Sequence, residues 1–287
     1  MLDLILSVIC STLILIIFKL YATYGVQTLY AIIVNYITAC CTGLFFYVGS
    51  VTFGDVLGRP WAWGTIALGV FFILVFNIIA KTSQVAGVSV ASVATKMSLV
   101  IPVIFGVFLY QEILSTIQVM GILLALAAVY FTSVKKGARQ ISKNALLLPL
   151  LAFLGSGLID ALIKYFEEVH LAEEELPIFS AVVFGAAALT GILFIGVNTF
   201  KKPLKVNPKN VVGGIALGIP NYFSIFFLVR ALQNEQFTSA AIFTINNVAI
   251  VMLSTLVGVW FFKESMSVKN WGGISLAVIS IVLVALF

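Results

Sequence analysis

The sequence consists largely of apolar runs of about 20 residues, separated by short polar breaks. A helical run of that length matches the hydrocarbon core of a bilayer, which is about 30 Å thick. Because the breaks are short, neighbouring helices must run antiparallel. The sequence therefore predicts an all-α membrane protein, a compact bundle of ten transmembrane helices. The predicted spans are about 2–20, 27–49, 61–80, 85–110, 115–134, 144–165, 176–199, 209–231, 237–262 and 267–287.

The composition agrees with a polytopic membrane protein. Of the 287 residues, 62% are hydrophobic and 9% are charged, against about 25% charged residues in an ordinary soluble domain. The N-terminus has no basic n-region followed by a small-residue cleavage site, so residues 2–20 are expected to form a first span rather than a signal peptide. Absence of a transit peptide favours the bacterial inner (cytoplasmic) membrane.

An internal repeat is visible when the sequence is shifted by 152 residues, which superposes the fourth and fifth spans on the ninth and tenth without a gap. The matched pairs include Gln84 with Gln236, Gly106 with Gly258, Glu112 with Glu264 and Gly121 with Gly273. A shift of 145 pairs Ser11 with Ser156 and Lys19 with Lys164. These matches predict two five-helix repeats, residues 1–138 and 139–287. Because five is odd, the repeats must be inverted relative to each other.

The basic residues gather in two loops, and the net charge of +5 therefore indicates topology rather than nucleic-acid binding. The positive-inside rule places both loops in the cytoplasm and both termini outside. The loop between the sixth and seventh spans, from Phe166 to Pro177, is acidic and holds the single histidine, His170. The basic residues are Lys135, Lys136, Arg139 and Lys143 in one loop and Lys201, Lys202, Lys205 and Lys209 in the other.

The fourth span carries Lys96 near its centre, where a lysine costs about 2.5–3.5 kcal/mol on an insertion scale. Ser92 shares its helix face, and Thr95 and Ser98 lie beside it. Pro102 has no N–H, so the helix is expected to kink and the Ser98 carbonyl to lose its helical partner. Such a face should point into a water-filled cavity or a protein interior. Lys96 is therefore predicted to bind a solute, with a purely structural lysine as the alternative.

Further polar residues extend this predicted solute site. An ammonium with neighbouring amides suits an acidic group on the solute, although the lysine could instead repel cations. Asn35, Tyr36 and Asn77 are interpreted as interhelical hydrogen-bonding residues. The full predicted set of solute-binding residues is Lys96, Ser92, Thr95, Asn247, Thr244, Tyr222 and Asn221.

Asp160 and Lys164 lie four residues apart in the sixth span. Residues at this spacing face each other on a helix. The two are predicted to form either a structural ion pair or a site in which Asp160 takes up the proton of a coupled transport cycle. Glu112 and Glu264 are predicted to be turn and capping residues. The small residues Gly121, Ala125, Gly273 and Ala277 are expected to allow close helix contact, within the protein or between protomers.

Enzymatic function is not expected. The single histidine, His170, lies in the acidic loop, where a solvated residue is expected rather than a partner of a catalytic serine. The chain has no HExxH zinc motif, and it contains neither a Walker sequence nor an Asp-rich pyrophosphate site. The three cysteines, Cys10, Cys40 and Cys41, lie in apolar runs without CxxC spacing and are interpreted as apolar side chains. The sequence therefore predicts no metal and no cofactor.

The architecture resembles the EamA type of the drug/metabolite transporter superfamily. The resemblance is carried by PVIFGVFLYQE and GILLALAAVY in the first half, and by TLVGVWFFKE and GGISLAVISI in the second. Gln111 and Lys263 stand where the family has the glycine of a Gly-Glu turn, and Ser254 stands opposite Pro102. The resemblance implies export of metabolites or amino acids. It also implies cytoplasmic termini in many members, contrary to the orientation given by the charges.

The expected function is that of a secondary transporter or facilitator. It would move a small amino-acid-like or organic-acid-like metabolite, in the export direction, by alternating access of the two repeats. Alternatives are a flippase for a lipid-linked cargo and a non-transporting assembly subunit of a membrane complex. Expected partners are the solute, the lipid bilayer and protons as the candidate coupling ion. The small-residue faces fit a monomer or a homodimer.

Overall fold

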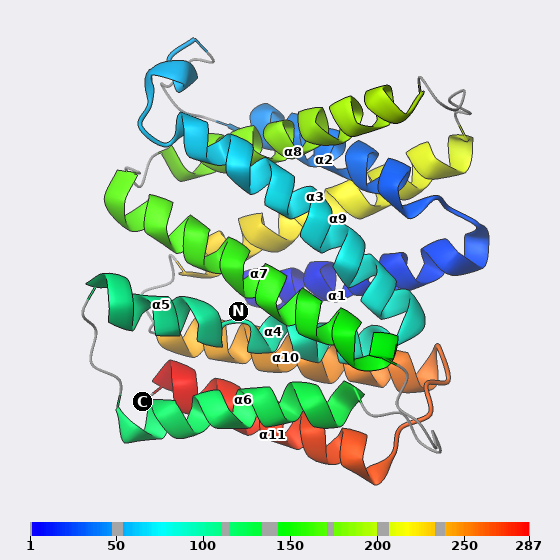
Figure 1. The fold of residues 1–287 in the computed structure, drawn as a ribbon, viewed down its shortest axis with the longest axis vertical. Coiled ribbons are helices and arrows are strands. Elements are labelled where there is room, and N and C mark those ends of the chain that lie inside the picture. Colours follow the sequence, from blue (N-terminus) through cyan, green and yellow to red (C-terminus); the bar gives the residue numbers. More distant parts are fainter. Residues whose placement is uncertain are drawn as a thin grey trace.

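The computed structural model describes residues 2–47, 54–110, 115–133, 143–170, 175–199, 207–232 and 239–286. All regular elements in these ranges are helices (Figure 1). Seven segments are long and apolar enough to cross a membrane, one of them Val88–Gly106, which covers two consecutive helices, and three shorter helices are also apolar. The all-α membrane fold is thus confirmed. The helices are α1 (Leu2–Tyr24), α2 (Thr28–Phe46), η1 (Val56–Gly58), α3 (Ala62–Val85), α4 (Val88–Met97), α5 (Val100–Tyr110), α6 (Thr116–Ser133), α7 (Lys143–His170), α8 (Leu176–Thr199), α9 (Pro208–Leu232), α10 (Ser239–Trp260) and α11 (Val268–Leu286).

The fourth predicted span is broken into α4 and α5 at Ser98 and Leu99. The cause is Pro102, which has no N–H to donate to the carbonyl of Ser98. The kink is therefore confirmed, and so is the loss of the helical partner of the Ser98 carbonyl. That carbonyl accepts a hydrogen bond from Ile101 N–H at 2.9 Å, because the chain tightens into a three-residue turn at the break.

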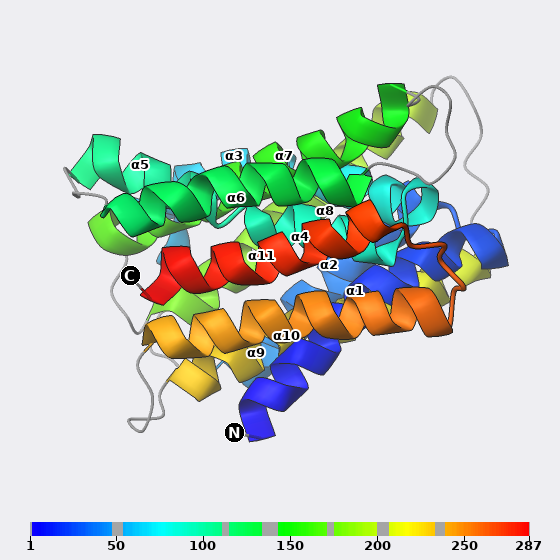
Figure 2. The ribbon, with the colours of Figure 1, turned by 90° about the horizontal axis from the view of Figure 1, so that it is seen from below.

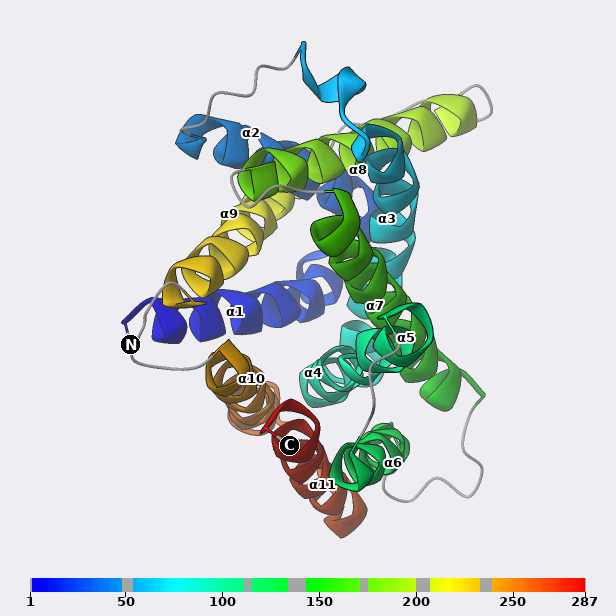
Figure 3. The same cartoon turned by 90° about the vertical axis from the view of Figure 1, so that its left-hand side faces the viewer.

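Helices that correspond in the two halves of the sequence pack against one another. α2 lies against α8 at one end of the bundle and α6 against α11 at the other, with α4 and α10 next to the second pair (Figures 1 and 3). Between these ends, α1 packs on α9 and α3 packs on α7. The predicted boundary between repeats, at residues 138 and 139, lies outside the described residues, so the two-repeat division stays a prediction.

Small residues bring α6 and α11 close together (Figure 2). A Cβ at Gly121 would lie 2.7 Å from Val284, and one at Gly273 would lie 2.8 Å from the backbone of Thr132. The Ser280 hydroxyl donates to the Gly121 carbonyl at 2.7 Å. Such contacts need backbones to approach closely, which glycine permits. The prediction of close helix contact at these glycines is confirmed within the protein.

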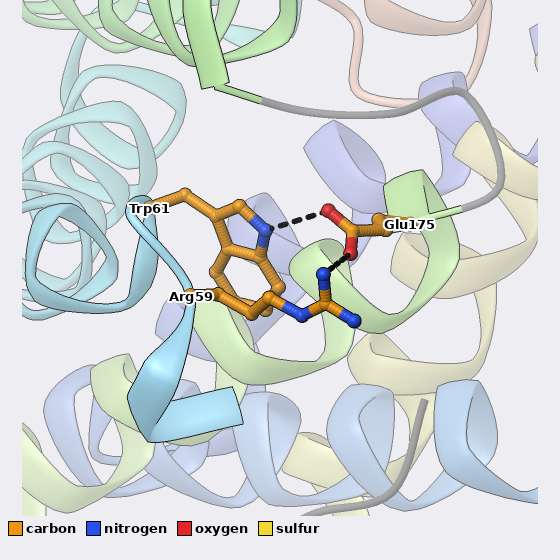
Figure 4. A network of polar contacts seen from close by, with 3 residues as sticks. All are labelled: Arg59, Trp61 and Glu175. Carbon is orange, nitrogen blue, oxygen red and sulfur yellow. Dashed lines mark hydrogen bonds and ion pairs between the residues drawn. The ribbon is translucent and has the colours of Figure 1, made fainter. Parts of the chain in front are cut away.

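The acidic segment between α7 and α8 was expected to be a loop from Phe166 to Pro177, and the structure differs. α7 continues to His170, so the loop does not begin at Phe166. Glu175 is buried (Figure 4): it accepts a hydrogen bond from Trp61 Nε1 at 3.0 Å and pairs with Arg59 at 2.9 Å. A buried carboxylate requires such partners. Glu175 is thus a structural residue that joins the start of α3 to the start of α8.

Candidate functional site

Two opposite charges meet inside the bundle, Lys96 in the last turn of α4 and Asp160 in the middle of α7. The two helices pack against each other, and among the described residues no ion pair of 4 Å or less joins the two charges. Ser98, just after α4, lies between them: its hydroxyl donates to the Thr95 carbonyl at 2.6 Å and is 3.4 Å from Asp160 Oδ2. Asp160 therefore faces α4. The spacing of Asp160 and Lys164 on α7 had predicted either an ion pair between them or an Asp160 that takes up a proton, and both alternatives stay predictions.

The surface of Asp160 is accessible although the residue lies in a membrane-spanning helix. A carboxylate exposed to lipid at this depth would be expensive, and such groups face a protein interior or a water-filled cavity. Asp160 also contacts Ser98, just after α4, as expected for a charged residue that faces other helices rather than lipid. Lys96 is half-buried beside it. The structure thus brings Lys96, Ser98 and Asp160 together where α4 and α7 pack.

Several buried polar atoms have no hydrogen-bond partner among the described residues. They are Ser92 Oγ on α4, Asn246 Oδ1 on α10, Thr12 Oγ1 on α1 and Asn35 Nδ2 on α2. α1, α4 and α10 pack against one another. Because an unpaired buried polar group is costly, these atoms are candidates for binding water or a solute. Ser92 was among the predicted residues, whereas Asn246 was missed.

The other residues predicted near Lys96 and Asp160 differ in burial and in hydrogen bonding. Thr95 is half-buried, and its hydroxyl donates back to the Ala91 carbonyl at 2.9 Å, which leaves its oxygen able only to accept. Asn247 is half-buried on α10 and makes no hydrogen bond with a described residue. The side chain of Thr244 lies outside what the structure describes. Lys164 is half-buried one turn beyond Asp160. Solute contact by these residues stays a prediction.

Asn221 and Tyr222 belong to contacts between α9 and α2. The Asn221 amide donates to Asn35 Oδ1 at 3.1 Å, and both residues are buried. Tyr222 is half-buried and stacks on Phe46 and Phe226, with ring centroids 6.2 and 5.9 Å apart. The interhelical hydrogen bond predicted for Asn35 is confirmed, whereas the one predicted for Asn77 is wrong, because its amide donates to the Ile73 carbonyl of the same helix at 2.7 Å. Tyr36 likewise bridges helices, donating to the Phe72 carbonyl at 2.9 Å.

The start of α4 is capped by a residue from the other half of the chain, Glu264. Its carboxylate accepts hydrogen bonds from Val88 N–H at 2.7 Å, from the Ser89 hydroxyl at 2.9 Å and from Ser89 N–H at 3.4 Å. A carboxylate at this place satisfies unpaired N–H groups and opposes the positive end of the helix dipole. The prediction that Glu264 is a capping residue is confirmed; Glu112 lies outside the described residues.

The turn that presents Glu264 has unusual backbone geometry. Lys263 has a φ of 52°, in the left-handed region that favours glycine. It occupies the position where the resembled family carries glycine, which gives that glycine a physical reason. Gly87, before α4, has a φ of 120°, and a Cβ there would lie 2.7 Å from Glu264 Oε1. The contact between Glu264 and α4 thus depends on close backbone approach.

The bundle of apolar helices defines a polytopic membrane protein, and Lys96 and Asp160 both lie in its candidate membrane spans. Comparison with known proteins places it further. The family model of the EamA-like transporter family matches residues 143–286, half of the sequence. The chain therefore belongs to the EamA-like transporter family, whose members move small solutes across a lipid bilayer.

Two other similarities extend over nearly the whole chain. An uncharacterized protein of Haemophilus influenzae is 27% identical over 278 residues, which cover 95% of this chain and 93% of that protein. A crystal structure of another protein aligns with a TM-score of 0.58 at 17% identity, covering 98% of this chain and 96% of the other. At that identity the second similarity shows the fold alone.

Proposed function

We propose that this chain is a secondary transporter or facilitator of a small amino-acid-like metabolite, working by alternating access. The solute would bind beside α4, with Lys96 and Asp160 on one side and the polar residues of α10 on the other. The proposal includes the export direction implied by the family resemblance, protons as the coupling ion and Asp160 as their carrier. It also includes a bacterial inner membrane with both termini outside.

The charge pair is the observation that supports this proposal. A lysine alone would favour an acidic solute, but here its charge is balanced by Asp160. A zwitterion matches both groups, because its carboxylate can bind Lys96 while its ammonium binds Asp160. During exchange, neither protein charge is left unpaired in a membrane-embedded site, where an unpaired charge is expensive. An amino-acid-like solute therefore fits better than a simple organic acid.

The break between α4 and α5 supports the same location. Transporter sites are commonly built at discontinuous helices, where backbone groups are released from the regular hydrogen-bond ladder. Here the break follows Lys96 by two residues. The unpaired atoms of Ser92 and Asn246 add neutral hydrogen-bonding capacity on α4 and α10. A solute there would meet charges and neutral polar groups from three helices.

The test is uptake of radiolabelled amino acids and organic acids into proteoliposomes. Wild type should show saturable uptake of an amino acid, and Lys96→Ala should lose it. Because Lys96→Ala leaves Asp160 unpaired, a second variant, Lys96→Gln with Asp160→Asn, removes both charges and tests the site without that penalty. Lys269→Ala, at an exposed lysine at the start of α11, is the matched control.

The doubly neutral variant separates a transport role from a structural one. Loss of uptake in a folded double variant, with Lys269→Ala unaffected, supports the proposed site. Uptake equal to wild type in that variant would make the pair structural and refute the proposed site. Absence of any uptake by folded wild type would refute transport of this solute class. An imposed pH gradient that leaves the uptake rate unchanged would refute proton coupling.

A further inference from the structure

A continuous apolar groove runs between α1 and α9. One hollow, of about 440 Å³, extends from Tyr24 and Lys209 at the helix ends to Ile17 and Ala216. A second, of about 350 Å³, continues from Ile17 and Ala216 to Cys10 on α1 and Phe227 on α9. Because the two hollows share Ile17 and Ala216, they form one groove. α1 and α9 lie side by side along it (Figure 3).

The groove exists because α9 carries small residues along this line. Gly213 and Ala216 leave space that a larger side chain would fill, and Ala216 is exposed. Tyr21 lies against Gly213, with its hydroxyl donating to the Gly213 carbonyl at 2.8 Å, so its polar atom is satisfied and its ring lines the hollow. The remaining lining side chains are apolar except at one end.

The length of the groove suits a lipid chain. Fourteen residues of α1 separate Cys10 from Tyr24, and at a rise of about 1.5 Å per residue they span about 21 Å. One leaflet of the hydrocarbon core is about 15 Å deep, half of the total. The groove therefore has room along its length for a whole acyl chain that enters from the membrane surface.

The charged end of the groove is positive. Lys209, at the first turn of α9, is exposed, and its ammonium is 3.4 Å from the Tyr24 carbonyl. No acidic residue is among the lining residues described for either hollow. At the far end of the two helices, the charge of Arg230 is already opposed by Asp3, 3.7 Å away. Three more lysines, Lys201, Lys202 and Lys205, precede Lys209 in the sequence.

We propose that this groove binds an anionic phospholipid, with one acyl chain along α1 and α9 and the headgroup phosphate at Lys209. The apolar lining packs against an acyl chain, and this contact does not depend on the headgroup. It therefore binds the chain of any phospholipid. The lysine selects for the negative headgroup, since a basic residue near the membrane surface favours anionic lipid about five-fold. This site is separate from Lys96 and Asp160 and does not depend on the transported solute.

The test is lipid titration of the detergent-solubilised full chain, followed by native mass spectrometry. The probes are phosphatidylglycerol and phosphatidylcholine with identical acyl chains. Wild type should bind phosphatidylglycerol about five-fold more tightly. Lys209→Gln should remove that preference and leave phosphatidylcholine binding unchanged. Ala216→Leu fills the groove where its two hollows meet, and it should weaken binding of both lipids by a similar factor.

Two matched controls give the test its specificity. Lys269→Gln removes an exposed lysine at the start of α11, and Ala67→Leu enlarges an exposed alanine on α3. Both should bind lipid as wild type does. The proposal is overturned if wild type binds the two lipids equally, if Lys209→Gln behaves like Lys269→Gln, or if Ala216→Leu behaves like Ala67→Leu. Ala216 and Lys209 are both exposed, so substitutions at either residue should leave the protein folded. The preference for the headgroup and the binding of the acyl chain are thus tested by separate variants.

Discussion

Replacing Glu264 by alanine removes the cap that joins the α10–α11 turn to the start of α4. Three hydrogen bonds are lost, two of them at 2.9 Å or shorter. Val88, whose N–H makes the shortest bond, is fully buried, so water cannot replace the carboxylate there. The change should therefore destabilise the protein and also loosen the helix that carries Lys96.

The magnitude follows from the groups left unpaired. Loss of an N-cap side chain costs about 0.5–2 kcal/mol, and a buried N–H without a partner costs about 1–3 kcal/mol. These contributions overlap, because the cap and the unpaired N–H are the same interaction seen from its two partners. A loss of about 2 kcal/mol for Glu264→Ala is compatible with both ranges. Glu264→Gln should lose about half of that, since an amide oxygen can still accept from Val88.

Reversible unfolding in mixed micelles of denaturing and mild detergent measures these losses. Ser89→Ala removes one of the three contacts, that of the Ser89 hydroxyl, and the double variant with Glu264→Ala should show a coupling energy of about 1 kcal/mol. Ser265→Ala, at the exposed residue next to Glu264, is the control and should unfold as wild type does. A loss below about 0.5 kcal/mol for Glu264→Ala, the range of ordinary surface substitutions, would refute the capping argument.

Two further substitutions test other parts of the structure by the same unfolding measurement. Lys263→Gly should stabilise the protein by about 1 kcal/mol, because glycine adopts the left-handed conformation at 52° without the steric penalty of a side chain; a loss of stability would contradict this. Glu175→Ala should destabilise it by about 3 kcal/mol, because the fully buried Trp61 N–H and the Arg59 charge both lose their partner. Wild-type stability in Glu175→Ala would show that water replaces the carboxylate.

The fold was largely predictable because a membrane imposes a simple rule on sequence. An apolar run of about 20 residues has to be helical, since no other backbone conformation satisfies its own hydrogen bonds in lipid. The kink at Pro102 was also predictable, because proline lacks the N–H that would continue the helical hydrogen bonds. Helix ends were less predictable: α7 continues to His170 because polar residues such as those of the acidic segment are compatible with helix beyond the membrane.

The contacts between helices could not be predicted with the same success. Periodicity places Lys96 and Ser92 on one face of α4, and it places Asp160 on a face of α7 with Lys164. It does not say which helix each face meets. The hydroxyl that contacts Asp160 belongs to Ser98, just after α4 and 62 positions earlier in the sequence, and Glu175 is held by residues that precede α3. Such pairings depend on how the bundle closes, which no local pattern contains.

The predicted repeat alignment gives the charge pair a further consequence. The shift of 152 matches Lys96 with Val248, and the shift of 145 matches Asp160 with Leu15. The contact between α4 and α7 is therefore charged, while its counterpart between α10 and α1 has a valine and a buried leucine in the same places. Separating α4 from α7 exposes charges that water or a zwitterion stabilises, whereas separating α10 from α1 at these positions exposes only apolar surface. In alternating access, the two states would thus differ in energy, and a solute that binds the charges would favour the state in which α4 and α7 are apart.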